Sequence, residues 1–586
     1  SIPSGKYFVE VQDNSGCIVG DTVEIVDQAQ DTYYVSTTGS NSNSGTSKTD
    51  AFESIAAAVN FACTNDTIIL LDGTYYEDSL LITKSLVIGS EYLLDADITH
   101  ISNTIIDGNN DGWIMTWQSA SSSNWADTLT NQLVGLTIQN GNSTNSSYAG
   151  GLSVWDSRSL SINHVHFENN VNTLNQGGAL WLRHNSAVQI SNTEFTQNST
   201  TQQGAAFYGT NVRLVMRDVS IYDNNVNASN GGLIRVDGAK YWDTKDVHIY
   251  NNSSTSSRLI FLNMGNLDAN AQFDSWTIKD NSTSDELLFL NSGTTGKEIT
   301  FQNMLLVNNT AQNRPGLVLD NYRGTYNFIN SIIADNSATN TGNYGAQFFA
   351  NYAASNDNPI INVFNSIIEG NNGYSFSDND WNADAYTLNI ENSYIQGGSS
   401  AIDVQAGTKN YGTSNISSGI YFKDAANGDY APSHVSAALG AGASSIILGS
   451  ASLSAPALDI YGNPRPNPAG TNPDLGAIEG LDSIPNVGIA AVVTNNGFCE
   501  TTSGSITANL LNYNGTGGVA YSWTNLSNPT QPFSPTTQQT GLASGDYSVV
   551  ASDPTDGTVL DSITVTVATA PAISITNTST DVTCFS

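Results

Sequence analysis

The sequence has little positive charge and few charged residues of either sign. Its 586 residues include 18 Lys and Arg against 53 Asp and Glu, so the formal net charge is −35, and charged residues make up 12% of the chain. Phosphate backbones and anionic lipids repel such a chain, which disfavours nucleic-acid binding and docking on a membrane surface. The sequence also lacks an apolar run long enough to cross a bilayer, and we predict no membrane insertion.

Cysteine is scarce as well. The four cysteines lack the paired spacing of a zinc site and are too few for a disulfide-dense scaffold; they are Cys17, Cys63, Cys499 and Cys584. Their surroundings repeat along the chain. Residues 4–21 match residues 544–561 at several Ser, Gly, Tyr, Val and Asp positions, and residues 485–499 are similar to residues 571–584.

These matches define a module of about 85 residues. We expect the chain to hold the last part of one module, a complete module and the start of another, over residues 1–28, 485–570 and 571–586. Within the complete module, alternating apolar runs such as 519–523 and 562–567 are separated by Gly, Asn and Pro turns. This pattern predicts a small Ig-like β-sandwich.

Between the modules a shorter period of about 28 residues recurs. Its unit is a β-branched run followed by Asn, and no helical pattern separates successive units. The period predicts a right-handed parallel β-helix over residues 31–480, so the expected fold class is all-β, with Ig-like modules flanking the β-helix. The central apolar residues of successive turns are Ile138, Phe167, Phe195, Ile221, Ile249, Ile278, Leu306, Ile333, Ile368 and Ile395.

A column of Asn residues supports stacked turns, and a predicted helix closes the first one. Asn tolerates the left-handed backbone of a tight corner, and stacked amides can bond along the β-helix. We place one such column at Asn140, Asn169, Asn198, Asn224, Asn251, Asn281, Asn308, Asn336 and Asn371. Near the start of the predicted β-helix, residues 50–53 indicate a capping box for a helix that covers the first turn. Cys63 is expected as a buried thiol on the apolar face of that helix.

The module resembles a known repeat. A Cys before Gly-Ser-Ile (Cys499 and residues 504–506), a Tyr-x-Trp strand (Tyr521, Trp523) and a terminal Gly-Cys ending at Cys17 are similar to the SprB repeat of gliding-motility adhesins of Bacteroidota. The resemblance implies part of a large extracellular adhesin that the type IX secretion system exports to the cell surface. It implies as partners an external surface or polysaccharide, the gliding machinery and the secretion apparatus. It also implies that Cys17 pairs with a cysteine outside this chain.

The β-helix resembles known families at both of its ends. Residues 33–75 are similar to the opening of secreted pectate-lyase-like β-helices, and residues 459–479 are similar to the terminal motif of choice-of-anchor Q surface proteins. The second resemblance implies a structural ion pair between Arg465 and either Asp474 or Glu479.

Enzymes also use this fold, so catalysis needs its own signal. The β-helix has no Gly-His-Gly, Arg-x-Lys or Asp-Asp motif, and His166 and His248 fall at equivalent, outward-facing positions. We therefore expect that the chain is not an enzyme. We interpret it as an adhesin whose β-helix is either a stiff spacer or a module that contacts glycans or surfaces. Two alternatives stay open: a polysaccharide lyase or hydrolase, and a structural stalk that binds nothing.

Two candidate binding sites remain. Asp107, Asn109 and Asp111 fit the first half of a calcium loop, although Gln118 stands where the closing Glu belongs, and Asn-Asp-Gly runs are also ordinary turns. We expect that the chain requires no cofactor. If the loop binds a metal ion, its oxygen ligands suit Ca²⁺. Trp155, Trp181 and Tyr208 lie at nearly matching places in successive turns, where they stack on sugar rings if they face outward or belong to the core if they face inward.

The resemblance to adhesins of Bacteroidota adds one expectation. Bacteroidota glycosylate secreted proteins at Asp-Ser/Thr-apolar sites, and several such triplets occur in this sequence. The resemblance implies sugars on those that fall in the modules or the linker: Thr22, Ser483 and Ser562.

Overall fold

The computed structural model describes most of the chain. The described residues are 5–12, 18–25, 30–118, 131–155, 159–183, 186–227, 231–255, 258–291, 293–340, 348–350, 358–371, 374–378, 386–405, 407–449, 451–480, 487–497, 502–513, 518–555 and 557–569. None of the described helices has the length and apolar character needed to cross a membrane.

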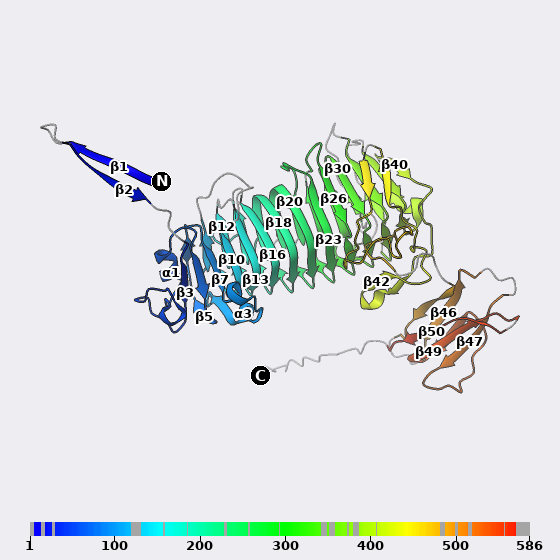
Figure 1. Ribbon diagram of the computed structural model, residues 1–586. Helices are drawn as coiled ribbons and strands as arrows, with labels where there is room; N and C mark the ends of the chain where they lie inside the picture. The colour runs from blue at the N-terminus through cyan, green and yellow to red at the C-terminus, as the bar shows by residue number, and fades with distance from the viewer. Residues whose placement is uncertain are drawn as a thin grey trace, which may run out of the picture.

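The central part is a parallel β-solenoid of the right-handed type, which confirms the predicted β-helix (Figure 1). Its longest row of parallel strands runs β3 (Thr32–Val35), β4 (Thr67–Leu70), β7 (Val87–Ser90), β10 (Gln132–Gln139), β13 (Leu160–Glu168), β16 (Ala187–Thr196), β18 (Phe207–Tyr222), β20 (Ile234–Tyr250), β23 (Ala271–Lys279), β26 (Glu298–Gln302), β30 (Thr325–Ile329), β34 (Ile360–Phe364), β37 (Thr387–Glu391) and β40 (Thr408–Tyr411).

A second row forms another face. It runs β6 (Leu80–Ile82), β9 (Met115–Trp117), β12 (Leu152–Trp155), β15 (Leu180–Arg183), β18, β20, β22 (Ile260–Asn263), β25 (Glu286–Asn291), β29 (Arg314–Asp320), β33 (Phe348–Ala350), β36 (Phe376–Asp378) and β39 (Ile402–Asp403). Shorter strands complete the turns, among them β5 (Gly73–Tyr76), β8 (Thr104–Asp107), β27 (Leu305–Val307), β31 (Ile332–Ala334), β35 (Ile367–Glu369) and β38 (Tyr394–Ile395).

The predicted apolar column is confirmed. Its members pair in register from Ile138 with Phe167 to Ile368 with Ile395, and each is almost completely buried in the core of the β-helix. Neighbouring aromatic rings stack as well, since Phe167 and Phe195 have centroids 4.9 Å apart. The recurrence of one apolar residue every turn therefore identified the core directly.

The predicted Asn column mixes two neighbouring columns. Asn140, Asn169, Asn251 and Asn308 have positive φ and form the corner itself. The next residue of each turn forms a buried ladder of Asn170, Asn198, Asn224, Asn252, Asn281, Asn309, Asn336 and Asn371. In this ladder the backbone N–H and the amide of Asn252 both donate to Oδ1 of Asn281, at 3.0 Å each. Because both columns use Asn, their spacing alone could not separate them.

A short helix covers the first turn, but it begins later than predicted. It is α1 (Ile55–Phe61), and the Ser54 hydroxyl caps it by accepting from the N–H of Ala57. The expected capping box at residues 50–53 is wrong, because Phe52 pairs with Val35 as an isolated bridge. The expected burial of Cys63 is also wrong: Cys63 lies beyond the end of α1 and is exposed.

The segment after β40 folds back along the side of the β-helix. It includes β41 (Phe422–Asp424), β42 (Asp429–Pro432), β43 (Ser445–Leu448) and β44 (Ala451–Ser454), and its apolar side chains share a core with Leu305, Ile332 and Ile367. Arg465 has a fully buried side chain there and pairs with Glu479 at 2.8 Å, which confirms one of the two predicted partners. The segment thus packs on the flank of the β-helix rather than across its last turn.

Smaller antiparallel sheets lie outside the β-helix. A hairpin joins β1 (Gly5–Gln12) and β2 (Ile18–Ile25). Near the other end of the chain, one core lies between two three-stranded sheets: β45 (Gly488–Thr494), β46 (Gly504–Leu511) and β48 (Gln538–Leu542), and β47 (Ala520–Asn525), β49 (Gly545–Ser552) and β50 (Val559–Val567).

Candidate functional site

The three predicted ligand-binding aromatics point outward from the second row of strands. Leu152, Val154, Leu180 and Leu182 alternate with them and lie in the core. Trp181 and Tyr208 pair in register, but Trp155 pairs with Arg183 and belongs to a neighbouring column. The structure therefore brings the three side chains close together without placing them in one line.

These outward aromatics are covered by other side chains. The ring of Tyr148 stacks on Trp155 with centroids 5.5 Å apart, and the guanidinium of Arg183 lies 3.9 Å from the Trp155 ring and 4.5 Å from the Trp181 ring. Trp181 is 5% exposed and Tyr208 is 6% exposed. Because a sugar needs an open ring face for stacking, Trp181 and Tyr208 offer little surface to one.

A cleft lined by both polar and apolar side chains lies along the longest row of strands and the adjoining strands β27 and β31. Its first part is a hollow of about 530 Å³ between the β-helix and the loop 456–462. The β-helix side of the wall carries carboxylates, a cation, an imidazole and amides, namely Asp218, Lys245, Asp246, His248, Asp274, Ser275, Gln302 and Asn303. The side chain of Lys245 lies 4.0 Å from that of Asp274.

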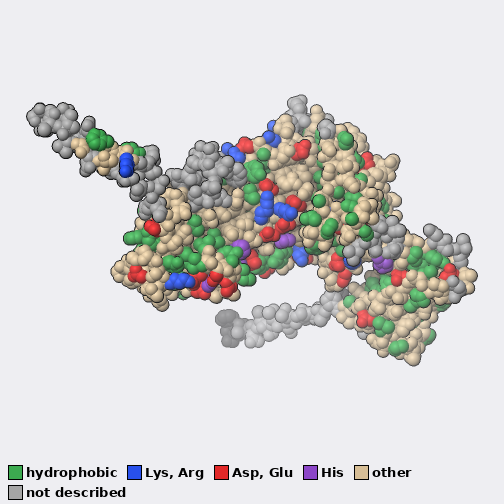
Figure 2. Space-filling model, in the orientation of Figure 1, with side chains coloured by type: hydrophobic (Ala, Val, Ile, Leu, Met, Phe, Trp, Pro, Cys, Tyr) green, Lys and Arg blue, Asp and Glu red, His purple; other side chains and the backbone are tan. Residues whose placement is uncertain are grey.

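The cleft continues into a second hollow of about 670 Å³, and both hollows have His248 and Tyr461 in their walls. The second hollow adds Lys279, Asp280 and Asp335, and lies against residues 425–428 of the returning segment. Tyr461 is 63% exposed. We call the two hollows together the flank cleft. Figure 2 shows Lys, Arg, Asp and Glu side chains gathered over the middle strands of this face, with His beside them.

Corner geometry places the carboxylates of the flank cleft. Asp218 and Asp246 occupy the same corner in adjacent turns, since Arg217 pairs with Lys245 and Val219 with Val247. Both have φ of 54°. This left-handed conformation is one that Asp and Asn adopt more readily than other residues with a Cβ. The backbones of the two residues therefore lie one strand spacing apart, about 4.8 Å.

The surroundings change the acidity of two of these groups. Burial raises the pKa of the Asp246 carboxyl above its usual range, with a smaller opposing effect from Lys245. Burial lowers the pKa of His248, so its imidazole is neutral at pH 7. Titratable groups with shifted pKa values in a cleft mark a candidate functional site.

The predicted calcium loop is a hydrogen-bonded turn in this structure. Asp107 is buried at the end of β8, where its Oδ1 accepts from the N–H of Asn109 at 2.7 Å. Its Oδ2 accepts from the amides of Gln139 and Asn140, at 2.7 and 2.9 Å. Asn109 has positive φ, and Asp111 is exposed. The carboxylate of Asp107 is thus already used by the turn and by the next turn of the β-helix.

The remaining predicted residues lie outside the β-helix. Thr22 is exposed on β2, and Ser562 is exposed on β50. Ser483 and Cys17 lie outside the described residues.

Sequence reasoning did not find the flank cleft. His248 was expected to face outward, as the structure shows it in the wall of the cleft, but Asp218 and Asp246 were not singled out. The available signal was Asp in place of Asn at a corner column whose other members include Asn192 and Asn303. The other wall comes from a segment about 200 residues further along the chain, and no local pattern predicts that approach.

Comparisons with known proteins give fold likeness only. No family model and no curated protein matches the sequence. Among solved structures, the chain is similar to XylC in complex with xylose (10% identity, TM-score 0.29, covering 65% of this chain and 77% of that one). It is also similar to pectate lyase Pel9A (11% identity, TM-score 0.29, covering 77% of this chain and 97% of that one). A third similar structure is a Yersinia enterocolitica family 28 exopolygalacturonase (9% identity, TM-score 0.28, covering 71% of this chain and 82% of that one).

Proposed function

We propose that this chain is part of an extracellular, cell-surface adhesin whose β-helix binds polysaccharide in the flank cleft. The observation that carries the proposal is the cleft itself. It is elongated, its walls combine charged and hydrogen-bonding side chains with apolar ones, and one exposed tyrosine, Tyr461, stands where its two hollows meet. Polysaccharides are bound by such combinations of hydrogen-bonding groups and an open aromatic ring.

The charges of the cleft narrow the ligand class. Its walls contain six Asp and two Lys, the carboxylates being Asp218, Asp246, Asp274, Asp280, Asp335 and Asp459. Both lysines have a carboxylate near by, since Lys245 lies 4.0 Å from Asp274 and Lys279 lies 3.9 Å from Asp280. The cleft is therefore net negative and repels uronic-acid polymers. We infer that its ligand is a neutral or amino-sugar polysaccharide.

A retention assay tests this proposal. The full chain is passed over immobilised neutral, amino-sugar and uronic-acid polysaccharides, and we expect retention on the first or second class but not on the third. Replacing Tyr461→Ala should weaken retention about tenfold, because it removes the open ring. Tyr76→Ala is the matched control, since Tyr76 is 72% exposed on β5, away from the cleft. Equal weakening by both variants, or retention on uronic-acid polymers alone, would contradict the proposal.

The rest of the chain supports an adhesin through its sequence. The SprB-like repeat pattern falls on the two three-stranded sheets of residues 487–569 and on the β1–β2 hairpin, and we propose that these are Ig-like modules of a gliding-motility adhesin exported by the type IX system. On this proposal the chain binds without cleaving, and the gliding machinery and secretion apparatus act on it through other regions. Ca²⁺ at the Asp107 turn is not needed for binding in the cleft.

One observation favours a second candidate function, a glycoside hydrolase. Asp246, with its raised carboxyl pKa, can serve as an acid, while the backbone of Asp218 lies about one strand spacing away in the neighbouring turn. Retaining glycosidases place their two carboxyl groups about 5 to 5.5 Å apart.

The two functions differ in one measurement. An adhesin retains polysaccharide and releases no new reducing ends during prolonged incubation. A hydrolase releases reducing ends, and Asp246→Asn abolishes that release while leaving retention intact. Release that depends on Asp246 would replace the adhesin proposal with the hydrolase.

A further inference from the structure

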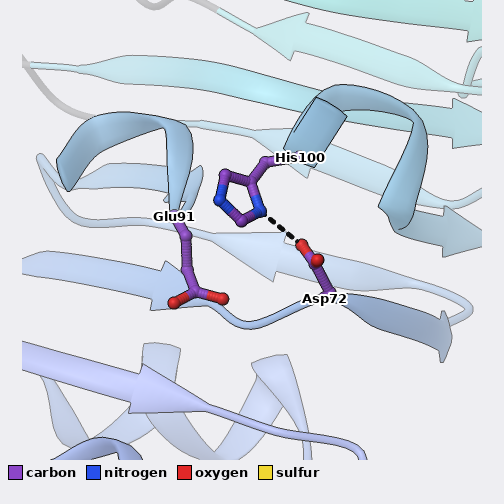
Figure 3. A group of neighbouring side chains, drawn as sticks. All are labelled: Asp72, Glu91 and His100. Carbon is purple, nitrogen blue, oxygen red and sulfur yellow. Dashed lines mark hydrogen bonds and ion pairs between the residues drawn. The ribbon is translucent and has the colours of Figure 1, made fainter. Parts of the chain in front are cut away.

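A histidine and two carboxylates meet on the N-terminal part of the β-helix, far along the chain from the flank cleft. Asp72 lies shortly after β4, Glu91 directly follows β7 and precedes α2 (Tyr92–Asp95), and His100 lies on α3 (Thr99–Asn103). Figure 3 shows the His100 ring pointing toward Asp72, with the Glu91 carboxylate beside them. Among the described residues this is the one group of at least three His, Cys, Asp or Glu whose ligand atoms all lie within 4.8 Å of one another.

Carboxylates hold the His100 ring from both sides. Its Nδ1 lies 2.6 Å from Asp72 Oδ1, and its Nε2 lies 3.3 Å from Asp95 Oδ2. The hydroxyl of Thr104 donates to the same oxygen of Asp72 at 3.3 Å. In metal sites, a carboxylate on the distal nitrogen of a ligating histidine fixes the ring, and Asp95 is placed to do this.

The group has more negative charge than its neighbours balance. Asp72, Glu91 and Asp95 supply three carboxylates; among the described residues one lysine, Lys48, pairs with them, through Glu91, and Asp72 and Asp95 raise the pKa of His100. A divalent cation between His100 and the carboxylates would offset the remaining charge.

The distances suit a small cation. Bonds of about 2.0 to 2.2 Å from a metal to nitrogen and oxygen place its ligand atoms about 3 to 4 Å apart. Asp72 must therefore move slightly away from His100, and its side chain is 42% exposed. Glu91 has to exchange Lys48 for the metal. An imidazole ligand selects a transition metal such as Zn²⁺ over Ca²⁺ or Mg²⁺, which prefer oxygen.

We propose that Asp72, Glu91 and His100 bind a divalent transition-metal cation of the Zn²⁺ class, with Asp95 orienting the imidazole and water completing the coordination. Asp72 follows β4, Glu91 follows β7 and His100 lies on α3. A metal held by all of them ties the segment of residues 91–103 to the second turn of the β-helix. The site would thus reinforce the N-terminal turns, independently of any ligand in the flank cleft.

Titration of the metal-free full chain with Zn²⁺ tests the proposal by calorimetry. We expect one tight site per chain, and at least about tenfold weaker binding in Asp72→Asn and His100→Gln. Asp95→Asn should weaken binding less than His100→Gln, because Asp95 acts through the ring. His166→Gln is the matched control on β13, outside the cluster, and should bind as the unaltered chain does. Equal affinity in His100→Gln and His166→Gln, or no tight site in the unaltered chain, would overturn the proposal.

A spectroscopic measurement guards against misfolded variants. Co²⁺ in place of Zn²⁺ gives visible absorption bands when nitrogen and oxygen ligands surround it in low coordination. We expect these bands in the unaltered chain and in His166→Gln, and their loss in His100→Gln with an unchanged far-ultraviolet circular dichroism spectrum. Bands that persist in His100→Gln would place the metal elsewhere.

Discussion

The two ends of the β-helix solve the problem of an open sheet edge differently. At the N-terminal end, the loop before α1 hydrogen-bonds along β3, with Tyr34 N–H donating to Gly45 O at 2.7 Å and Phe52 N–H to Tyr34 O at 2.9 Å. The apolar side of α1 then buries Ile55, Ala58 and Val59. At the other end, β40 pairs with β37 alone among the described strands, and residues 408–410 are exposed.

The C-terminal end is instead held from the side. Arg465 donates to Glu479, to Asn303 Oδ1 at 2.7 Å and to the carbonyl of Gly476 at 3.0 Å, which joins the returning segment to the corner of β26. Asp474 completes this group, which we call the flank clasp. The comparison teaches that an apolar cap gains stability in proportion to the area it buries, whereas a buried charge group depends on every partner being present.

The largest expected effect comes from breaking the flank clasp. Arg465→Ala leaves Glu479 buried without its cation, and we expect a loss of about 3 to 5 kcal/mol in the free energy of unfolding. Denaturant unfolding gives the magnitude. Hydrogen exchange should show increased exchange in residues 456–480, with α1 and β3 unchanged.

A surface pair provides the control for this variant. Arg217 lies 2.7 Å from Asp243, but both side chains are about one third exposed. Arg217→Ala should therefore cost at most about 1 kcal/mol. If both arginine variants lose the same stability, the flank clasp contributes no more than a surface ion pair, and the contrast between the two ends fails.

The sequence predicted the features that recur in every turn of the β-helix. It did not predict contacts between segments that lie far apart in the chain. One apolar residue per turn defined the core column, and Arg465 found Glu479 because both lie in one short motif. The corner and ladder columns were merged because Asn serves both: positive φ favours Asn at Asn251, and side-chain bonding up the stack favours it at Asn252.

The candidate sites were harder to predict for the same physical reason. Alternation alone did not decide whether Trp155 and Trp181 face outward or inward. It also could not show that Tyr148 and Arg183 cover them, since Tyr148 comes from a loop. The flank cleft needs the returning segment near Tyr461 to lie against the corner of Asp246, about 215 residues earlier in the chain. No periodic pattern contains that contact.

The second prediction uses pH to separate the two ends. Burial raises the pKa of Asp474 to about 7, with Glu479 adding to the shift. Since the folded chain then holds a proton that the unfolded chain releases near pH 4, the free energy of unfolding falls as pH rises from about 4 to about 7, by up to about 1 kcal/mol per pH unit. After correction for the intrinsic pH dependence of amide exchange, the protection of residues 456–480 should fall along this trend, while the protection of α1 stays constant.

Asp474→Asn checks the origin of this pH dependence. The variant loses one acceptor for the N–H groups of Gly440 and Gly480, so it is less stable at low pH. It should nevertheless have a flatter pH profile than the unaltered chain. A profile as steep as before would assign the pH dependence to another group.

The smallest effect is expected at the N-terminal cap. Ser54→Ala removes the hydroxyl that accepts from the N–H of Ala57, and we expect a loss of about 1 kcal/mol, seen as faster exchange in α1 and the edge of β3. Ser47→Ala is the control, because Ser47 precedes the short helix at Lys48–Asp50 without a capping bond. The apolar contacts of Ile55 and Val59 remain in both variants, so the cap should loosen locally and stay docked. Loss of exchange protection as far as β7 in Ser54→Ala would show that the N-terminal end, like the flank clasp, depends on a single polar contact.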